Sequence, residues 1–155
     1  MLAIHKRIIK EVLQEKKRDP KVIAILLFGS IARGAAHELS DIDIEIIYLG
    51  ERYKTKEEKR YGIKVDYEFW PKKKLAKRFK KYPFLSYPYL SEKILYDKTG
   101  FLKKFKAKVK TYFKENPEVL KEWQKWEKNY LAAKKKGKKI LDVDEFYSSL
   151  KKKFS

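Results

Sequence analysis

Three aspartates have the type and the spacing for metal-assisted chemistry. Asp41 and Asp43 stand two residues apart in a segment that alternates polar and apolar side chains, so both carboxylates should point to one face of a strand. Asp66 lies in a second alternating segment and should also face outward. Close carboxylates raise one another's pKa, and bound divalent cations relieve that repulsion. Two such cations about 3.5–4 Å apart can clamp the attacking and leaving oxygens of a phosphoryl displacement. Asp66 could ligate a metal, take the proton of an acceptor, or do both.

A phosphate-binding turn is predicted just before the aspartates. An apolar, branched run ends in Gly29 and Ser30, where a glycine lets the backbone approach a ligand closely. The free amide groups of a following helical turn favour a phosphate, and Ser30 adds a hydroxyl. Arg33 and Lys64 could each contact phosphate or form an ordinary ion pair with the carboxylates. Ser40, directly before the second strand, is counted with the nucleotide-binding residues.

The elements that must position these residues follow from apolar periodicity and from the breaks at proline and glycine. We expect strands over residues 22–28, 41–48, 63–70 and 94–96. We expect helices over residues 2–18, 31–36, 71–81, 101–114, 117–136 and 142–153, the last with Asp142 as its N-cap. The highly charged residues 50–61 predict a solvated hairpin loop. This order predicts an α/β fold, with a small mixed sheet that has helices packed on one face, and a C-terminal helical extension. We place the catalytic domain at 1–100 and the basic extension at 101–155.

The composition limits the metal and the cellular compartment. The chain has no cysteine and only two histidines. We expect His5 on a helix surface and His37 in a loop, too few for a His-rich site. Any metal should therefore have oxygen ligands, which favours Mg²⁺ or Mn²⁺. No apolar run reaches the roughly 18 residues of a membrane span, and the first ten residues lack a signal-peptide core. We expect a cytoplasmic protein without membrane contact, and the residue usage is typical of a thermophile.

Positive charge is concentrated late in the sequence. Residues 1–70 hold 14 Lys/Arg and 12 Asp/Glu, whereas residues 71–155 hold 26 and 9. A field of that sign attracts RNA or an acidic protein; the alternative is a solvated, lysine-rich surface. The basic helix over 71–81 could line the active-site groove or be such a solvated face. Trp123, Trp126 and Tyr130 recur at helical spacing, which favours packing over base stacking.

The motif GSIARGAAHELSDIDIEII carries a family resemblance. A Gly-Ser pair, ten residues and then Asp-x-Asp resemble the signature of the DNA polymerase β-like nucleotidyltransferase superfamily. The version in this chain is most similar to the minimal nucleotidyltransferases (MNT). Members of that group are antitoxin partners of HEPN ribonucleases, and some transfer AMP from ATP to a tyrosine of the toxin. The superfamily also includes aminoglycoside nucleotidyltransferases and tRNA CCA-adding enzymes. The resemblance covers residues 22–70 and continues more loosely to about 97.

The resemblance implies a role for each matching residue. Asp41 and Asp43 would bind metal, Asp66 would complete the triad, and Gly29 and Ser30 would hold the triphosphate. The implied activity is Mg²⁺-dependent transfer of a nucleoside monophosphate, AMP from ATP being the expected case, to a protein hydroxyl. Transfer to RNA or to a small-molecule hydroxyl is one alternative. A non-catalytic basic module that binds RNA or protein is another.

Overall fold

The computed structural model describes residues 2–34, 37–137 and 143–155. These residues form two compact units. Unit 1 contains residues 1–77 and 91–106, and unit 2 contains residues 78–90 and 107–155. The predicted N-cap residue Asp142 lies outside the described residues, as does the end of the predicted 31–36 helix. The domain division predicted at residue 100 stays a prediction.

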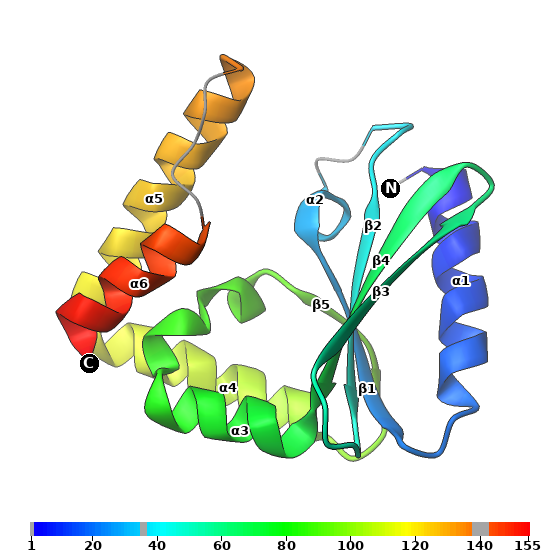
Figure 1. The fold of residues 1–155 in the computed structure, drawn as a ribbon, viewed down its shortest axis with the longest axis horizontal. Helices are drawn as coiled ribbons and strands as arrows, with labels where there is room; N and C mark the ends of the chain where they lie inside the picture. The colour runs from blue at the N-terminus through cyan, green and yellow to red at the C-terminus, as the bar shows by residue number, and fades with distance from the viewer. Residues whose placement is uncertain (1, 35–36, 138–142) are drawn as a thin grey trace. The chain divides into compact units, whose positions relative to one another are not determined.

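A five-stranded mixed sheet forms the centre of unit 1 (Figure 1). Its spatial order is β3-β4-β2-β1-β5. The strands are β1 (Val22–Phe28), β2 (Ile42–Tyr48), β3 (Lys54–Arg60), β4 (Ile63–Pro71) and β5 (Lys93–Asp97). Strands β2 and β4 are parallel, and the other neighbouring pairs are antiparallel. The predicted α/β fold with a small mixed sheet is therefore confirmed.

Helix α1 (Ala3–Lys17) packs against one face of this sheet (Figure 1). Its apolar stripe includes Ile8 and Val12, which join the core formed by the apolar positions of β2 and β4. These positions alternate with the acidic ones, so the aspartates face away from α1. His5 corrects an expectation: it is fully buried rather than on the helix surface. Neither of its ring nitrogens has a hydrogen-bond partner among the described residues.

The expectation of a loop over residues 50–61 is wrong, because β3 occupies most of that segment. The strand lies at the edge of the sheet, and β4 is its one partner among the described strands. Its sequence, KTKEEKR, has no alternation of apolar and polar residues. Charged side chains are common on edge strands because they prevent pairing with further strands. A two-residue turn at Tyr61 and Gly62 joins β3 to β4, and both residues have positive φ, as a tight hairpin of this kind requires.

The described remainder of the chain is helical apart from its connections. The short helix α2 (Gly29–Ala32) starts two residues before the predicted turn. Helices α3 (Lys72–Lys81) and α4 (Phe101–Glu115) each begin in unit 1 and end in unit 2. Unit 2 adds two 3₁₀ turns, η1 (Pro83–Leu85) and η2 (Tyr87–Leu90), and the helices α5 (Pro117–Lys135) and α6 (Val143–Phe154).

Aromatic side chains form the core of unit 2. The Trp123 indole is 3% exposed and donates a hydrogen bond to the Phe84 carbonyl at 2.7 Å. It stacks on Tyr87 with ring centroids 4.9 Å apart, while Trp126 stacks on Phe146 at the same separation. Packing rather than base stacking is thus confirmed for Trp123.

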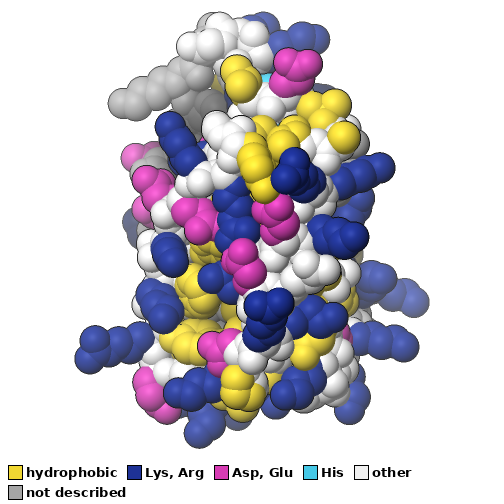
Figure 2. Space-filling model, turned by 90° about the vertical axis from the view of Figure 1, so that its right-hand side faces the viewer, with side chains coloured by type: hydrophobic (Ala, Val, Ile, Leu, Met, Phe, Trp, Pro, Cys, Tyr) yellow, Lys and Arg dark blue, Asp and Glu magenta, His cyan; other side chains and the backbone are white. Residues whose placement is uncertain are grey.

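The surface over α1 carries mixed charge. Figure 2 shows lysine and arginine side chains interspersed with carboxylates and apolar groups on this side. Arg60 links β3 to α1 through Glu15 at 2.5 Å and also contacts Glu58 at 2.6 Å. Within the three described ranges, no helix combines the length and the apolar character that a membrane crossing requires.

Candidate active site

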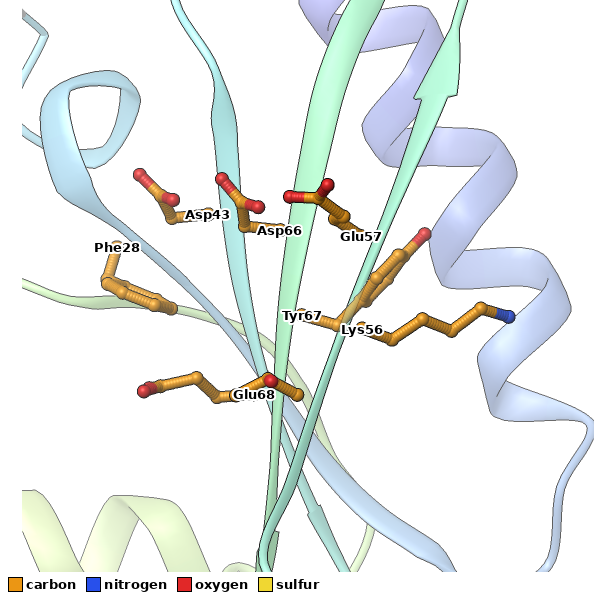
Figure 3. A pocket seen from close by; sticks show the side chains of 8 residues that line it. Phe28, Asp43, Lys56, Glu57, Asp66, Tyr67 and Glu68 are labelled. Carbon is orange, nitrogen blue, oxygen red and sulfur yellow. The ribbon is translucent and has the colours of Figure 1, made fainter.

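Strand register brings two of the three predicted aspartates together. Asp43 of β2 is the direct partner of Asp66 on the parallel strand β4. The same row continues to Glu57 of β3 on one side and to Phe28 of β1 on the other. Figure 3 shows the carboxylates of Asp43, Asp66 and Glu57 side by side. All four residues line a pocket of about 370 Å³, which leaves room for a small ligand over the acidic row.

Asp43 is the most perturbed carboxyl group of this row. Partial burial and, to a smaller extent, the nearby charges of Asp66 and Asp41 together raise the pKa of Asp43 to about 6, although Lys64 lowers it. A bound divalent cation would reverse this balance, because it stabilises the ionised form. Asp43 is therefore the carboxylate with the most to gain from a cation.

Gly29 allows the phosphate-binding turn to lie against Asp43. Its φ is +75°, and a Cβ added there would stand 2.3 Å from Oδ2 of Asp43. A side chain at this position would therefore require the Asp43 carboxylate to move. The positive φ also favours glycine on conformational grounds. The local structure thus explains why a glycine follows β1 as the first residue of α2.

Asp41 lies one residue before β2 and is more exposed than Asp43. Its Oδ2 is 3.6 Å from Nζ of Lys64, and Lys64 is also 3.5 Å from Oδ2 of Asp66. Of the two roles predicted for Lys64, the structure displays ion pairing with the carboxylates. This lysine therefore links the first and third predicted aspartates.

The other predicted nucleotide-binding residues lie in α2, at its end and just before β2. Ser30 lies in α2 and is partly buried. Arg33 follows α2 as its C-cap and is exposed. Ser40 is 6% exposed, and its Oγ accepts a hydrogen bond from the backbone N–H of His37 at 2.9 Å. A ligand contact by Arg33 or Ser40 stays a prediction. His37 lies between the elements, as expected.

A second, deeper group of acidic residues lies on the same sheet face. Glu45 and Glu68 are direct partners, two residues beyond Asp43 and Asp66. Glu45 is 3% exposed and Glu92, just before β5, is 4% exposed. Burial, together with the charges of Glu45 and Glu68, raises the pKa of Glu92 well above its usual range. Its Oε2 has no hydrogen-bond partner within the part of the chain that the structure describes.

The donor set suits a hard divalent cation, although no cluster is preformed. Asp41, Asp43 and Asp66 offer only carboxylate oxygen, the ligand type that Mg²⁺ prefers. Burial and the neighbouring carboxylates raise the pKa of Asp43, and a bound cation would favour its ionised form. However, among residues 2–34, 37–137 and 143–155 no three acidic or histidine side chains are arranged to hold a metal ion. The residues fit the cation chemically, and side-chain movement must complete the site.

Sequence reasoning missed two acidic residues of this face. Glu57 was placed in a loop, but the β3–β4 register puts it beside Asp66. The available sequence signal was the Tyr61-Gly62 pair, since such a pair between a charged and an alternating segment can close a hairpin. Glu92 had no signal, because its burial depends on packing between distant segments.

The fold and the acidic face together define a nucleotidyltransferase domain. The family described as "Polymerase beta, Nucleotidyltransferase" matches residues 7–99, more than half of the chain. The chain belongs to this family. The matched range ends just after β5 and so includes all five strands of the sheet.

Solved structures share the fold. One of them is a nucleotidyltransferase-like protein from Exiguobacterium sibiricum, with a TM-score of 0.52 and 11% sequence identity. The match covers 65% of this chain and 37% of that protein. At such low identity the likeness shows the fold alone, and this chain spans little more than a third of its neighbour. A search of curated proteins found no match.

Proposed function

We propose that this protein transfers a nucleoside monophosphate, AMP from ATP in the expected case, to a hydroxyl acceptor and releases pyrophosphate. The observation that carries the proposal is the pairing of Asp43 with Asp66 across two parallel strands, beside the Gly29 turn. Membership of the nucleotidyltransferase family supports the reaction class. The approximately 370 Å³ pocket over the pair would receive the reacting groups.

The proposed step is an in-line displacement at phosphorus. The acceptor oxygen forms a bond to the α-phosphorus, and the bond from this atom to the bridging oxygen breaks. Pyrophosphate leaves with the bonding electrons. Asp41, Asp43 and Asp66 would hold Mg²⁺ or Mn²⁺, which when bound would neutralise charge on the phosphate oxygens. Asp66, whose side chain is 33% exposed, is the candidate to take the acceptor's proton.

The phosphates would lie against the turn that follows β1. Gly29 brings the backbone within reach of a ligand above Asp43, and Ser30 offers a hydroxyl and an amide beside it. Arg33 and Ser40 are proposed as further contacts to the nucleotide. This arrangement would place the α-phosphate between the turn and the carboxylates, where positioning contributes most to phosphoryl transfer.

The most specific form of the proposal names the acceptor. The motif subtype and the compact catalytic unit favour an MNT-type antitoxin that modifies a hydroxyl of a HEPN ribonuclease. A partner protein of that kind, acidic where it meets the lysine-rich regions, would then be the physiological acceptor. A neighbouring gene for a small helical ribonuclease would support this version.

The test uses the full chain with each labelled nucleoside triphosphate, Mg²⁺ and candidate acceptors. Label should pass to one acceptor class, and Asp41→Asn or Asp43→Asn should abolish the transfer. Lys59→Gln, a charge change on the neighbouring exposed strand, is the matched control that should retain it. Absence of transfer to any protein, RNA or alcohol, together with absence of metal-dependent triphosphate binding, would refute the proposal.

RNA is the second candidate acceptor, favoured by the lysines of unit 1. The sequence has no acidic residue between Glu68 and Glu92. On α3 and α4, the exposed lysines that belong to unit 1 are Lys73, Lys74 and Lys77 of α3 and Lys103 and Lys104 of α4. The first turns of these two helices are neighbours, because Nζ of Lys72 lies 5.2 Å from the ring centroid of Phe101. Protein interfaces are depleted in lysine, whereas lysines neutralise the phosphates of nucleic acids.

Salt dependence distinguishes this second candidate. Replacing Lys73, Lys74 and Lys77 by Gln should reduce the slope of log K against log salt by about 2 for single-stranded RNA. The control replaces Lys6, Lys10 and Lys59, which removes the same charge from other exposed positions. Equal slopes for the two triple variants would show that these lysines have no special part in RNA binding.

A further inference from the structure

Lys64 lies between carboxylates of β3, of β4 and of the residue directly before β2. Its Nζ is 3.5 Å from Oδ2 of Asp66 on β4 and 3.6 Å from Oδ2 of Asp41 beside β2. It is also 3.9 Å from Oε2 of Glu57 on β3. These carboxylates raise the pKa of Lys64, Asp66 contributing most. The ammonium is therefore the cation that the metal-free site already contains.

Two of these contacts use oxygens that a metal would need. The proposed function assigns Asp41 and Asp66 to a divalent cation, but their Oδ2 atoms both face the lysine. A carboxylate oxygen that faces an ammonium presents its lone pairs to it and cannot direct them equally well to Mg²⁺.

Two ion pairs of Arg60 are shorter and more buried than those of Lys64. Arg60 contacts Glu15 at 2.5 Å and Glu58 at 2.6 Å, and its side chain is only 16% exposed. Lys64 is 41% exposed and its contacts are about 1 Å longer. Exposed ion pairs contribute little to stability, and a lysine holds carboxylates as a flexible point charge rather than as a rigid fork. Lys64 is thus held loosely enough to leave.

We propose that Lys64 is an exchangeable counter-ion of the active site. It keeps Asp41 and Asp66 together in the metal-free protein and leaves them when the divalent cation binds. Its ammonium then turns to the phosphates of the bound nucleoside triphosphate, the nearest new anions. Asp43, which has no ion pair with Lys64 among the described residues, remains the fixed ligand throughout. The proposal rests on the metal site of the proposed function.

The exchange predicts effects of opposite sign for one substitution. Without Lys64 the metal meets no competitor, so metal alone should bind more tightly. The triphosphate loses a cationic contact, so it should bind more weakly once metal is present. A residue that merely supported the fold would weaken both. The opposite signs therefore identify the exchange.

The experiment measures free Mn²⁺ by electron paramagnetic resonance during titration of the full chain, first without and then with ATP. Lys64→Gln should bind Mn²⁺ alone roughly fivefold more tightly than the unsubstituted protein, the size expected for the loss of two exposed ion pairs. It should bind ATP more weakly at saturating Mn²⁺, and its metal-free form should unfold at a lower temperature. Lys64→Arg, which keeps the charge, should not gain Mn²⁺ affinity.

Lys59→Gln is the matched control for charge. Lys59 is the direct partner of Lys64 on β3, and it has no ion pair among the residues that the structure describes. The Lys59→Gln substitution should change the affinity for Mn²⁺ by less than twofold. Equal or weaker Mn²⁺ binding by Lys64→Gln would overturn the exchange while leaving the metal site in place. If neither the unsubstituted protein nor Lys64→Gln binds Mn²⁺, the proposed function fails as well.

Discussion

Replacing Gly29 by alanine should separate the geometry of the active site from the stability of the fold. The residue has a φ of +75°, so any side chain there costs roughly 1–2 kcal/mol of folding free energy. The added Cβ would also stand 2.3 Å from Oδ2 of Asp43. Ordinary contact requires about 3.4 Å or more, so the carboxylate must move by about 1 Å.

Gly34→Ala is the matched control for this substitution. Gly34 has a similar φ of +73°, but a Cβ added there would meet no described atom within 4 Å. Both variants should therefore lose a similar amount of stability in urea unfolding. Only Gly29→Ala should disturb Asp43. Since a displacement of about 1 Å can reduce a reaction about 100-fold, nucleotidyl transfer and Mn²⁺ affinity should fall in Gly29→Ala alone.

The decisive comparison is activity at matched stability. Both variants should be assayed under conditions in which they are folded, with the Asp43 carboxyl carbon followed by NMR. A shifted Asp43 resonance and lost transfer in Gly29→Ala, with a near-normal Gly34→Ala, would agree with the geometry. If Gly29→Ala retained transfer as well as Gly34→Ala does, the close contact between the turn and Asp43 would play no part in function.

Further predictions concern buried charge. NMR titration of the metal-free protein should give Asp43 a pKa of about 6, and Asp66→Asn should lower it by removing a repelling charge; an unchanged value would contradict their coupling. Because the folded-state pKa of Asp43 lies above its unfolded value, stability should be lost as pH rises through about 6, and Asp43→Asn should abolish that loss in urea unfolding. Burial also raises the folded-state pKa of Glu92, so its contribution to stability should likewise be lost as pH rises. Glu92→Gln should therefore leave the free energy of unfolding unchanged at pH 4 and increase it at pH 8. Equal effects at both pH values would show that Glu92 is not held neutral.

The sequence predicted the parts of the site that depend on local spacing. Asp41 and Asp43 share a face because a strand alternates, and Gly29 stands out because it ends an apolar run. The register of β2 against β4 confirmed that Asp66 faces the same way as Asp43. Such features need only the chain near each residue, so periodicity can find them.

Features that depend on pairing between distant segments were missed. The strand β3 has one neighbour and an exposed, charged sequence, so no apolar pattern marked it. Its absence from the prediction hid Glu57 on the acidic row. Burial of His5 and Glu92 is likewise decided by packing rather than by local pattern, because polar residues are usually exposed. An ion pair of Lys64 with the carboxylates was one of the two predicted roles, but only the pairing of β4 with its neighbours shows which three carboxylates are its partners.

The position of a label on ATP tests the central claim most directly. Full-length protein is incubated with Mg²⁺ and its acceptor, using ATP labelled at the α-phosphate in one sample and at the γ-phosphate in the other. Nucleotidyl transfer predicts that the α-label passes to the acceptor and the γ-label appears in pyrophosphate, and that Asp43→Asn and Asp66→Asn lose both signals. Passage of the γ-label to the acceptor, or undiminished transfer in Asp43→Asn, would contradict the assignment of the Asp43–Asp66 pair as a nucleotidyltransferase centre.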